Sequence, residues 1–108
     1  MPDAAILVLT HVPDRAVATA LAKALLDDRL AACVSIGSPV EAIYHWHGRI
    51  ETAAEFPVAI KTRPALYSGV ENVIRKVHPY DTPEIIAIPV VAGYDRYLSW
   101  LAAETASP

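Results

Sequence analysis

The side chains of this sequence that can bind a metal ion are few and are spread along the chain. There are four histidines and one cysteine: His11, His45, His47, His78 and Cys33. His45 and His47 are two residues apart, so on a strand they would share a face, and such an imidazole pair can chelate Cu(II), Ni(II) or Zn(II). No pair has the close spacing of a zinc motif. The spacing therefore indicates at most a weak, exchangeable metal site, which neighbouring subunits could share.

Other polar side chains with chemical potential are concentrated in residues 77–94. His78, Tyr80, Asp81 and Glu84 lie there among three prolines, which fix their own φ and bias the preceding residue toward extended backbone. A stiff polar segment of this kind suits a binding site or a demanding subunit contact, and equally a proline-rich turn. Asp81 and Glu84 could form an acid–base pair, with a turn cap and a salt bridge as the alternative roles. No nucleophile or oxyanion donor accompanies them, so we expect no enzyme.

Apolar periodicity predicts the elements that position these residues. Short apolar runs predict strands, and apolar residues at i, i+3, i+4 and i+7 predict helices. Gly48 supplies a hairpin turn, and Pro57 marks an edge or bulge position within its strand. The predicted strands cover Ala5–Thr10, Leu30–Ile36 with its continuation through a kink into Val40–Trp46, Ile50–Thr62 and Ile85–Val91, and the predicted helices cover Asp14–Arg29, Pro64–Val77 and Tyr94–Glu104.

This order of elements predicts an α+β fold, a ferredoxin-like βαββαβ sandwich in one domain over residues 1–108. Four antiparallel strands carry two helices on one face, with an extended hairpin and a short C-terminal helix. The topology gathers the histidines at one end of the sheet, and its first and last strands are neighbours, which allows His11 and His78 to lie close. Cys33 falls at the other end of its strand, so a Cys–His nucleophile is not expected. The alternative roles are exposed loop positions for His11, His45 and His47, a hydrogen-bonded structural role for His78, and a small buried apolar residue for Cys33.

The composition of the 108-residue chain indicates an oligomer. Its hydrophobic content of 54% exceeds the ~45–50% of typical domains, and its charged content of 19% falls below the typical ~25%. The nine basic residues are scattered and the net charge is −3, so no nucleic-acid surface is expected. One cysteine fits a reducing compartment. Met1–Asp3 show no basic region leading into an apolar segment, so we expect no signal peptide. No apolar run approaches the ~20 residues of a membrane span, so we expect a cytoplasmic protein with neither a membrane nor a nucleic-acid partner.

Several joined motifs make the sequence resemble the CutA family of divalent-cation tolerance proteins. The resemblance covers nearly the whole chain in the family's order. The matching pieces are Leu30–Ile36, Tyr44-x-Trp46-x-Gly48-x-Ile50, Ile60-Lys61-Thr62, the dense stretch His78–Val90, Gly93, and Tyr97-Leu98-x-Trp100.

The resemblance implies a cytoplasmic homotrimer with a role in tolerance of copper and other divalent metals, without catalysis and without an obligatory cofactor. The expected ligand is copper or another divalent cation. The family is also similar in architecture to PII signalling proteins, which implies a small-molecule sensor with clefts between subunits as the alternative. A structural trimer that organises a partner protein is a further alternative. By the family's motifs the implied metal ligands are Cys33, His78 and Glu84, and the implied cleft residues are Trp46, Lys61, Tyr80 and Asp81.

Three departures from the family pattern concern this site. Val12 stands where the family often has a cysteine before Pro-Asp, which removes one soft ligand, and His11 precedes it. Asp81 stands where glutamate is common. His45 and His47 occupy variable positions, so the resemblance assigns them no role.

Overall fold

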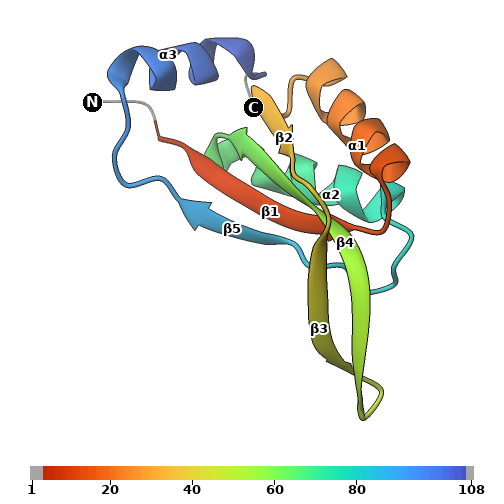
Figure 1. Cartoon of the computed structure of the whole chain (residues 1–108). Helices are drawn as coiled ribbons and strands as arrows, with labels where there is room; N and C mark the ends of the chain where they lie inside the picture. Colours follow the sequence, from red (N-terminus) through yellow and green to blue (C-terminus); the bar gives the residue numbers. More distant parts are fainter. Residues whose placement is uncertain (1–3, 107–108) are drawn as a thin grey trace.

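Five strands form one antiparallel sheet, and two helices cover one of its faces (Figure 1). The computed structural model describes residues 4–106. The first three residues, to which the signal-peptide expectation referred, and the last two lie outside the described part. The strand order is β2-β4-β1-β5, and β3 pairs with the outer part of β4. The elements are β1 (Ile6–Val12), α1 (Arg15–Asp27), β2 (Cys33–Ile36), β3 (Val40–Trp46), β4 (Arg49–Thr62), the 3-10 turn η1 (Pro64–Leu66), α2 (Tyr67–Val77), β5 (Ile86–Pro89) and α3 (Asp95–Glu104).

The predicted α+β, ferredoxin-like architecture is confirmed, but the strands differ from the prediction. The strands expected over Leu30–Ile36 and Ile85–Val91 are shorter, at Cys33–Ile36 and Ile86–Pro89. The second predicted strand is two strands, β2 and β3, which pair with successive parts of β4. The first strand was expected to end at Thr10 but continues to Val12, because His11 pairs with Pro57 and Val12 with Phe56. His11 is therefore a strand residue rather than a loop residue.

Pro57 lies inside the central strand β4, where a proline is normally excluded. Its carbonyl accepts a hydrogen bond from the Gly37 N–H at 2.9 Å. The N and C=O of one strand residue point to the same neighbour, so the missing N–H of Pro57 faces the gap between β2 and β3. The chain passes from β2 to β3 at the one position where β4 lacks a backbone N–H donor. No hydrogen bond of the sheet is lost there, which explains how an interior proline is tolerated.

The hydrophobic core lies between the sheet and the helices α1 and α2. Alternate β1 residues face the helices, and α1 begins at Asp14, whose side chain accepts a hydrogen bond from the Val17 N–H at 2.9 Å. The helix α3 lies across the end of the sheet where β1 begins, with Leu98 and Leu101 packed on Ala5. None of the described helices has the length and apolarity needed to cross a bilayer. The main core residues are Val8, Val12, Leu21, Leu25, Val58, Ile60, Val70 and Ile74.

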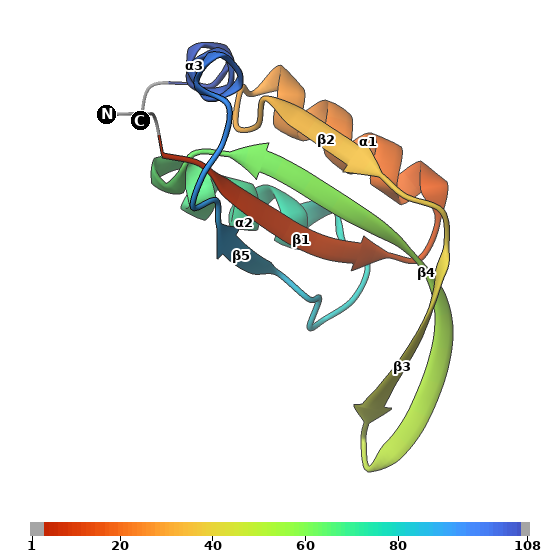
Figure 2. The ribbon, with the colours of Figure 1, turned by 60° about the vertical axis from the view of Figure 1, so that its left-hand side comes forward.

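Beyond the helices, β3 and the first part of β4 continue as a two-stranded arm, residues 40–55 (Figure 2). His47 and Gly48 form its tip, with φ of 50° and 75°. Positive φ at both residues of a two-residue turn matches the hairpin turn whose twist suits β-strands. The arm stretches the molecule to 47 Å along its long axis, against 26 and 23 Å along the others.

Candidate functional site

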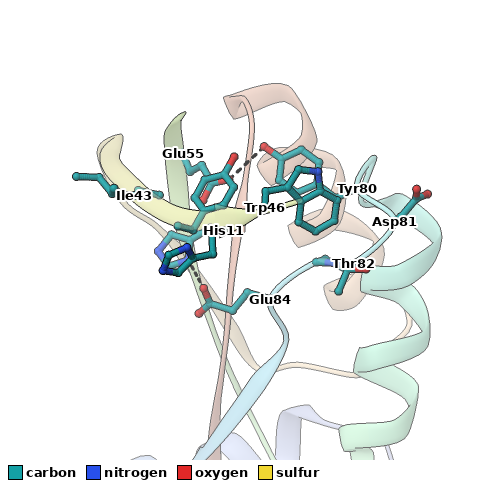
Figure 3. Close-up of a pocket in the computed structure, with 12 residues that line it drawn as sticks. His11, Ile43, Trp46, Glu55, Tyr80, Asp81, Thr82 and Glu84 are labelled. Carbon is teal, nitrogen blue, oxygen red and sulfur yellow. Dashed lines mark hydrogen bonds and ion pairs between the residues drawn. The ribbon is translucent and has the colours of Figure 1, made fainter. Parts of the chain in front are cut away.

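A cleft of about 680 Å³ lies between β3 and the loop of residues 80–84 (Figure 3). It is open to solvent on one side, and four segments of the chain line it. The two arm strands β3 and β4 form one wall, the 80–84 loop forms the other, and the end of β1 closes the base. Its aromatic lining residues are Tyr44, Trp46 and Tyr80; its carboxylates are Glu55, Asp81 and Glu84; its imidazoles are His11 and His45.

At the base of the cleft, His11 and Glu84 form a close pair. His11 Nδ1 lies 3.1 Å from Glu84 Oε1, and both side chains remain partly exposed. Strand alternation turns His11 away from the helices, and Glu84 lies two residues before β5, which pairs with β1. A carboxylate at Nδ1 favours the proton on that nitrogen and leaves the Nε2 lone pair free. This is the arrangement by which carboxylates orient metal-binding histidines in proteins.

His78 supports the cleft from behind instead of facing it. The residue is only 6% exposed. Its Nε2 donates to the His11 carbonyl at 2.6 Å, and its Nδ1 accepts from the Tyr80 N–H at 3.1 Å. Both ring nitrogens are thus used, so His78 has no lone pair left for a metal. The hydrogen-bonded structural role fits this geometry: His78 ties the 80–84 loop to the end of β1.

Glu55 and Tyr80 join the arm to the loop across the cleft. The Tyr80 hydroxyl donates to Glu55 Oε2 at 3.1 Å, and Glu55 is only 8% exposed. Burial, then the hydrogen bond and negative charge of Glu55, raise the pKa of Tyr80 above its usual value, and Tyr44 adds to the effect. Sequence reasoning missed Glu55. The sequence did hold one signal for it. Glu55 is a carboxylate inside the predicted strand Ile50–Thr62, directly before Phe56-Pro57.

Cys33 and Lys61 lie together at a different place, on β2 and β4. Cys33 and Lys61 are paired across β2 and β4. On the other side of β4, Lys61 pairs with Leu7 of β1, which is four residues before His11 on that strand. Lys61 Nζ donates to Ser35 Oγ at 2.6 Å and lies 3.7 Å from Cys33 Sγ. Cys33 is partly rather than fully buried.

The implied ligand sets are therefore brought together only in part. Trp46, Tyr80 and Asp81 line the cleft and Lys61 does not. Of the three implied metal ligands, Glu84 is in the cleft, His78 lies behind it, and Cys33 is remote. Within residues 4–106 no group of three or more His, Cys, Asp or Glu side chains is arranged to hold a metal ion.

The two arm histidines do not form the expected same-face pair. His45 lies on β3 and lines the cleft. His47 lies in the turn at positive φ, where strand alternation no longer applies, and its ring contacts Trp46 edge-on at 4.7 Å between centroids.

Comparisons with known proteins show what the whole chain is similar to. The family model of the CutA1 divalent ion tolerance protein matches residues 6–104. The divalent-cation tolerance protein CutA of Thermus thermophilus is 39% identical over 98 residues, which cover 91% of this chain and 95% of that protein. The chloroplastic CutA of Arabidopsis thaliana is 38% identical over 100 residues, and the human CutA is 40% identical over 95 residues. The matches cover 93% and 88% of this chain, but only 55% and 53% of those two longer relatives.

Solved structures match over nearly the whole chain. CutA1 from Oryza sativa superposes with a TM-score of 0.95 at 36% identity, covering 99% of this chain and 98% of that one. The Cut A1 protein from Thermus thermophilus superposes with a TM-score of 0.92 at 37% identity, covering 94% of this chain and 99% of that one.

Proposed function

Because this chain belongs to the CutA1 divalent ion tolerance family, we propose that it acts in tolerance of divalent metal ions, copper among them, by reversible binding without catalysis. The binding site is the base of the cleft, where His11 Nε2 is the imidazole ligand and Glu84 orients it. The observation that carries this assignment is the His11–Glu84 pair at 3.1 Å in an open cleft. Imidazole suits Cu(II) and Zn(II), and a site with few protein ligands suits exchange.

The proposed assembly is a homotrimer in the cytoplasm. Its support is the large apolar surface of the arm and of the segment after β5, where Ile43 is 63%, Ile50 is 69% and Val91 is 94% exposed. A surface of this kind marks an interaction site. The cytoplasmic location rests on the single free cysteine, although two relatives are named as chloroplastic and a solved structure as periplasmic.

Isothermal titration with CuCl2 and ZnCl2 tests the metal site. We expect the unmodified chain to bind, and His11→Gln and Glu84→Gln each to weaken binding about 10-fold or more, as loss of a ligand or of its orienting carboxylate does. His47→Asn is the matched control, because it removes an imidazole outside the cleft and Asn tolerates positive φ. Unchanged affinity in both cleft variants would refute the site. Loss of binding in Cys33→Ser alone would place the metal at β2 instead.

The dimensions of the cleft favour a second function, the binding of a small molecule. About 680 Å³ lies within the ~300–1,000 Å³ usual for ligand sites, and aromatic side chains beside a few polar groups are the usual lining. Thermal-shift measurements with a panel of cationic, neutral and anionic metabolites test this role. A rise in melting temperature that Trp46→Ala abolishes would support it, and no shift with any compound would refute it.

A further inference from the structure

One half of the cleft offers aromatic surface instead of metal ligands. Tyr44, Trp46 and Tyr80 line it, and each keeps about two-fifths of its surface exposed. The face of an aromatic ring gives a metal ion no lone pair, but its quadrupole attracts an organic ammonium group within about 6 Å. This half therefore calls for a ligand different from the metal ion at the His11–Glu84 pair.

The charge of the cleft is negative. Its lining includes three carboxylates, Glu55, Asp81 and Glu84, and neither lysine nor arginine. In Figure 3 Glu55 points toward the Tyr80 hydroxyl, whereas Asp81 points away from the other labelled side chains. Negative charge around the rings disfavours a phosphate or carboxylate ligand and favours a cation.

Glu55 supplies the second, independent observation. It is 92% buried, and within residues 4–106 it forms no ion pair; its partner is the neutral Tyr80 hydroxyl. A buried carboxylate without a countercharge costs free energy, and a cation placed against it would offset that cost. The carboxylate lies at the wall of the cleft, where a ligand can reach it.

We propose that the aromatic half of the cleft binds an organic cation of the alkylammonium class, held by the faces of Trp46, Tyr44 and Tyr80 and by the charge of Glu55. The assignment rests on the small-molecule role proposed above and names its ligand class. The metal ion at His11 is a separate ligand, because the aromatic half gives it no donor atoms.

Fluorescence titration of Trp46 tests this assignment with two probes of one shape. Choline carries a trimethylammonium group, and 3,3-dimethylbutan-1-ol is its uncharged carbon isostere. The Trp100→Phe background makes Trp46 the sole tryptophan, because the sequence has two, and Trp100 lies on α3 away from the cleft. We expect saturable quenching by choline, at least about 10-fold weaker binding of the alcohol, and no effect of sodium chloride at matched ionic strength.

The Glu55→Gln variant isolates the charge, since it keeps the side-chain shape. We expect it to weaken choline binding about 10-fold, while Glu41→Gln, an exposed carboxylate on the neighbouring strand β3 and outside the cleft, leaves it unchanged. Equal affinity for choline and the alcohol, or no binding of choline, would overturn the assignment. The two probes decide this on the Trp100→Phe chain even if Glu55→Gln fails to fold. Binding of an anionic or neutral metabolite in place of choline would overturn the ligand class and leave the small-molecule role standing.

Discussion

The helix-covered half of the sheet and the β3–β4 arm bury their apolar side chains to opposite extents. Val8, Leu25 and Ile60 are fully buried between sheet and helices, whereas Ile43 and Ile50 on the arm are about two-thirds exposed. Both regions share the continuous strand β4. The backbone pairing is therefore the same, and the difference is the second layer that only one half possesses.

The helix-covered half is therefore stabilised by packing within the chain, whereas the arm is not. A two-stranded ribbon alone is marginally stable in water, so the arm needs contacts beyond its own ladder. Within the chain, Tyr80 meets Glu55 from the 80–84 loop. The cleft lies where the two regions meet: His11 and Glu84 come from the core side, and Trp46 and Glu55 from the arm. Covering the outer arm therefore also bears on the geometry of the site.

The largest expected effect is in the core, and two adjacent leucines of α1 provide a matched pair. Leu25 is fully buried and Leu26 is 42% exposed. We expect Leu25→Ala to lower the free energy of unfolding by about 2–5 kcal/mol, through lost burial and a cavity. Leu26→Ala should cost about 1 kcal/mol or less. Denaturant unfolding at one protein concentration measures both, and equal losses would show that the core is not where the burial places it.

The arm should respond through association instead of through the fold of a single chain. A charge at Ile43, in Ile43→Asp, would be buried against a neighbouring copy, so we expect the dissociation constant of the oligomer to rise at least tenfold, about 1.4 kcal/mol. Sedimentation equilibrium measures this, with circular dichroism to verify the fold. Ala20→Asp, the same charge on the exposed face of α1, is the control. An unchanged oligomer in Ile43→Asp would remove the arm from the interface.

The core half was largely predictable from the sequence. Apolar periodicity identified the strands and helices because burial against one second layer imposes a period of 2 or 3.6. The errors came from hydrogen bonding, which periodicity does not report. The end of β1 was placed too early because the pairing of His11 with Pro57 depends on the register with β4. The separation of β2 from β3 depends on the Gly37–Pro57 contact.

The site was predictable only to the level of its segment. The motif around residues 78–84 located Tyr80, Asp81 and Glu84 at the cleft. The role of His78 depends on which partners its two nitrogens reach, and Lys61 is remote because strand position, not motif membership, decides which end of the sheet a residue occupies. Glu55 became visible only when the arm brought it to Tyr80.

A smaller effect is expected from two buried threonines of neighbouring strands. Thr62 donates its hydroxyl to the Leu30 carbonyl at 2.6 Å, whereas Thr10 Oγ1 has no hydrogen-bond partner within residues 4–106. We expect Thr10→Val to raise the free energy of unfolding by about 1 kcal/mol, because the isosteric change removes an unpaired buried hydroxyl. Thr62→Val should lower it by about as much. Chemical denaturation compares them, and a loss in both would mean that Thr10 has a partner, such as a buried water.

The smallest expected effect is on the free energy of unfolding at alkaline pH. It distinguishes the Tyr67–Glu71 contact inside the core half from the Tyr80–Glu55 contact between the core half and the arm. The pKa of Tyr67 is raised by its hydrogen bond to Glu71, then by burial and by the Glu71 charge, and both residues lie on α2. The pKa of Tyr80 is raised by burial first and then by Glu55 on the arm. A raised pKa in the folded state means that folding holds the proton more tightly than the unfolded chain does.

The stabilisation from each phenol is therefore complete below its unfolded pKa of about 10, and it is lost as the pH rises through the higher folded pKa. We expect the free energy of unfolding to fall above about pH 10 and the decline to be shallower in Tyr80→Phe and in Tyr67→Phe. Phenolate absorbance against pH, with denaturant unfolding at each pH, measures this. If association fixes the arm against Tyr80, Ile50→Asp, at an exposed arm position that does not line the cleft, should weaken association, lower the Tyr80 pKa toward its ordinary value and leave that of Tyr67 in place. A joint shift of both would mean that arm and core are not separable, and that the contrast between them is one of exposure alone.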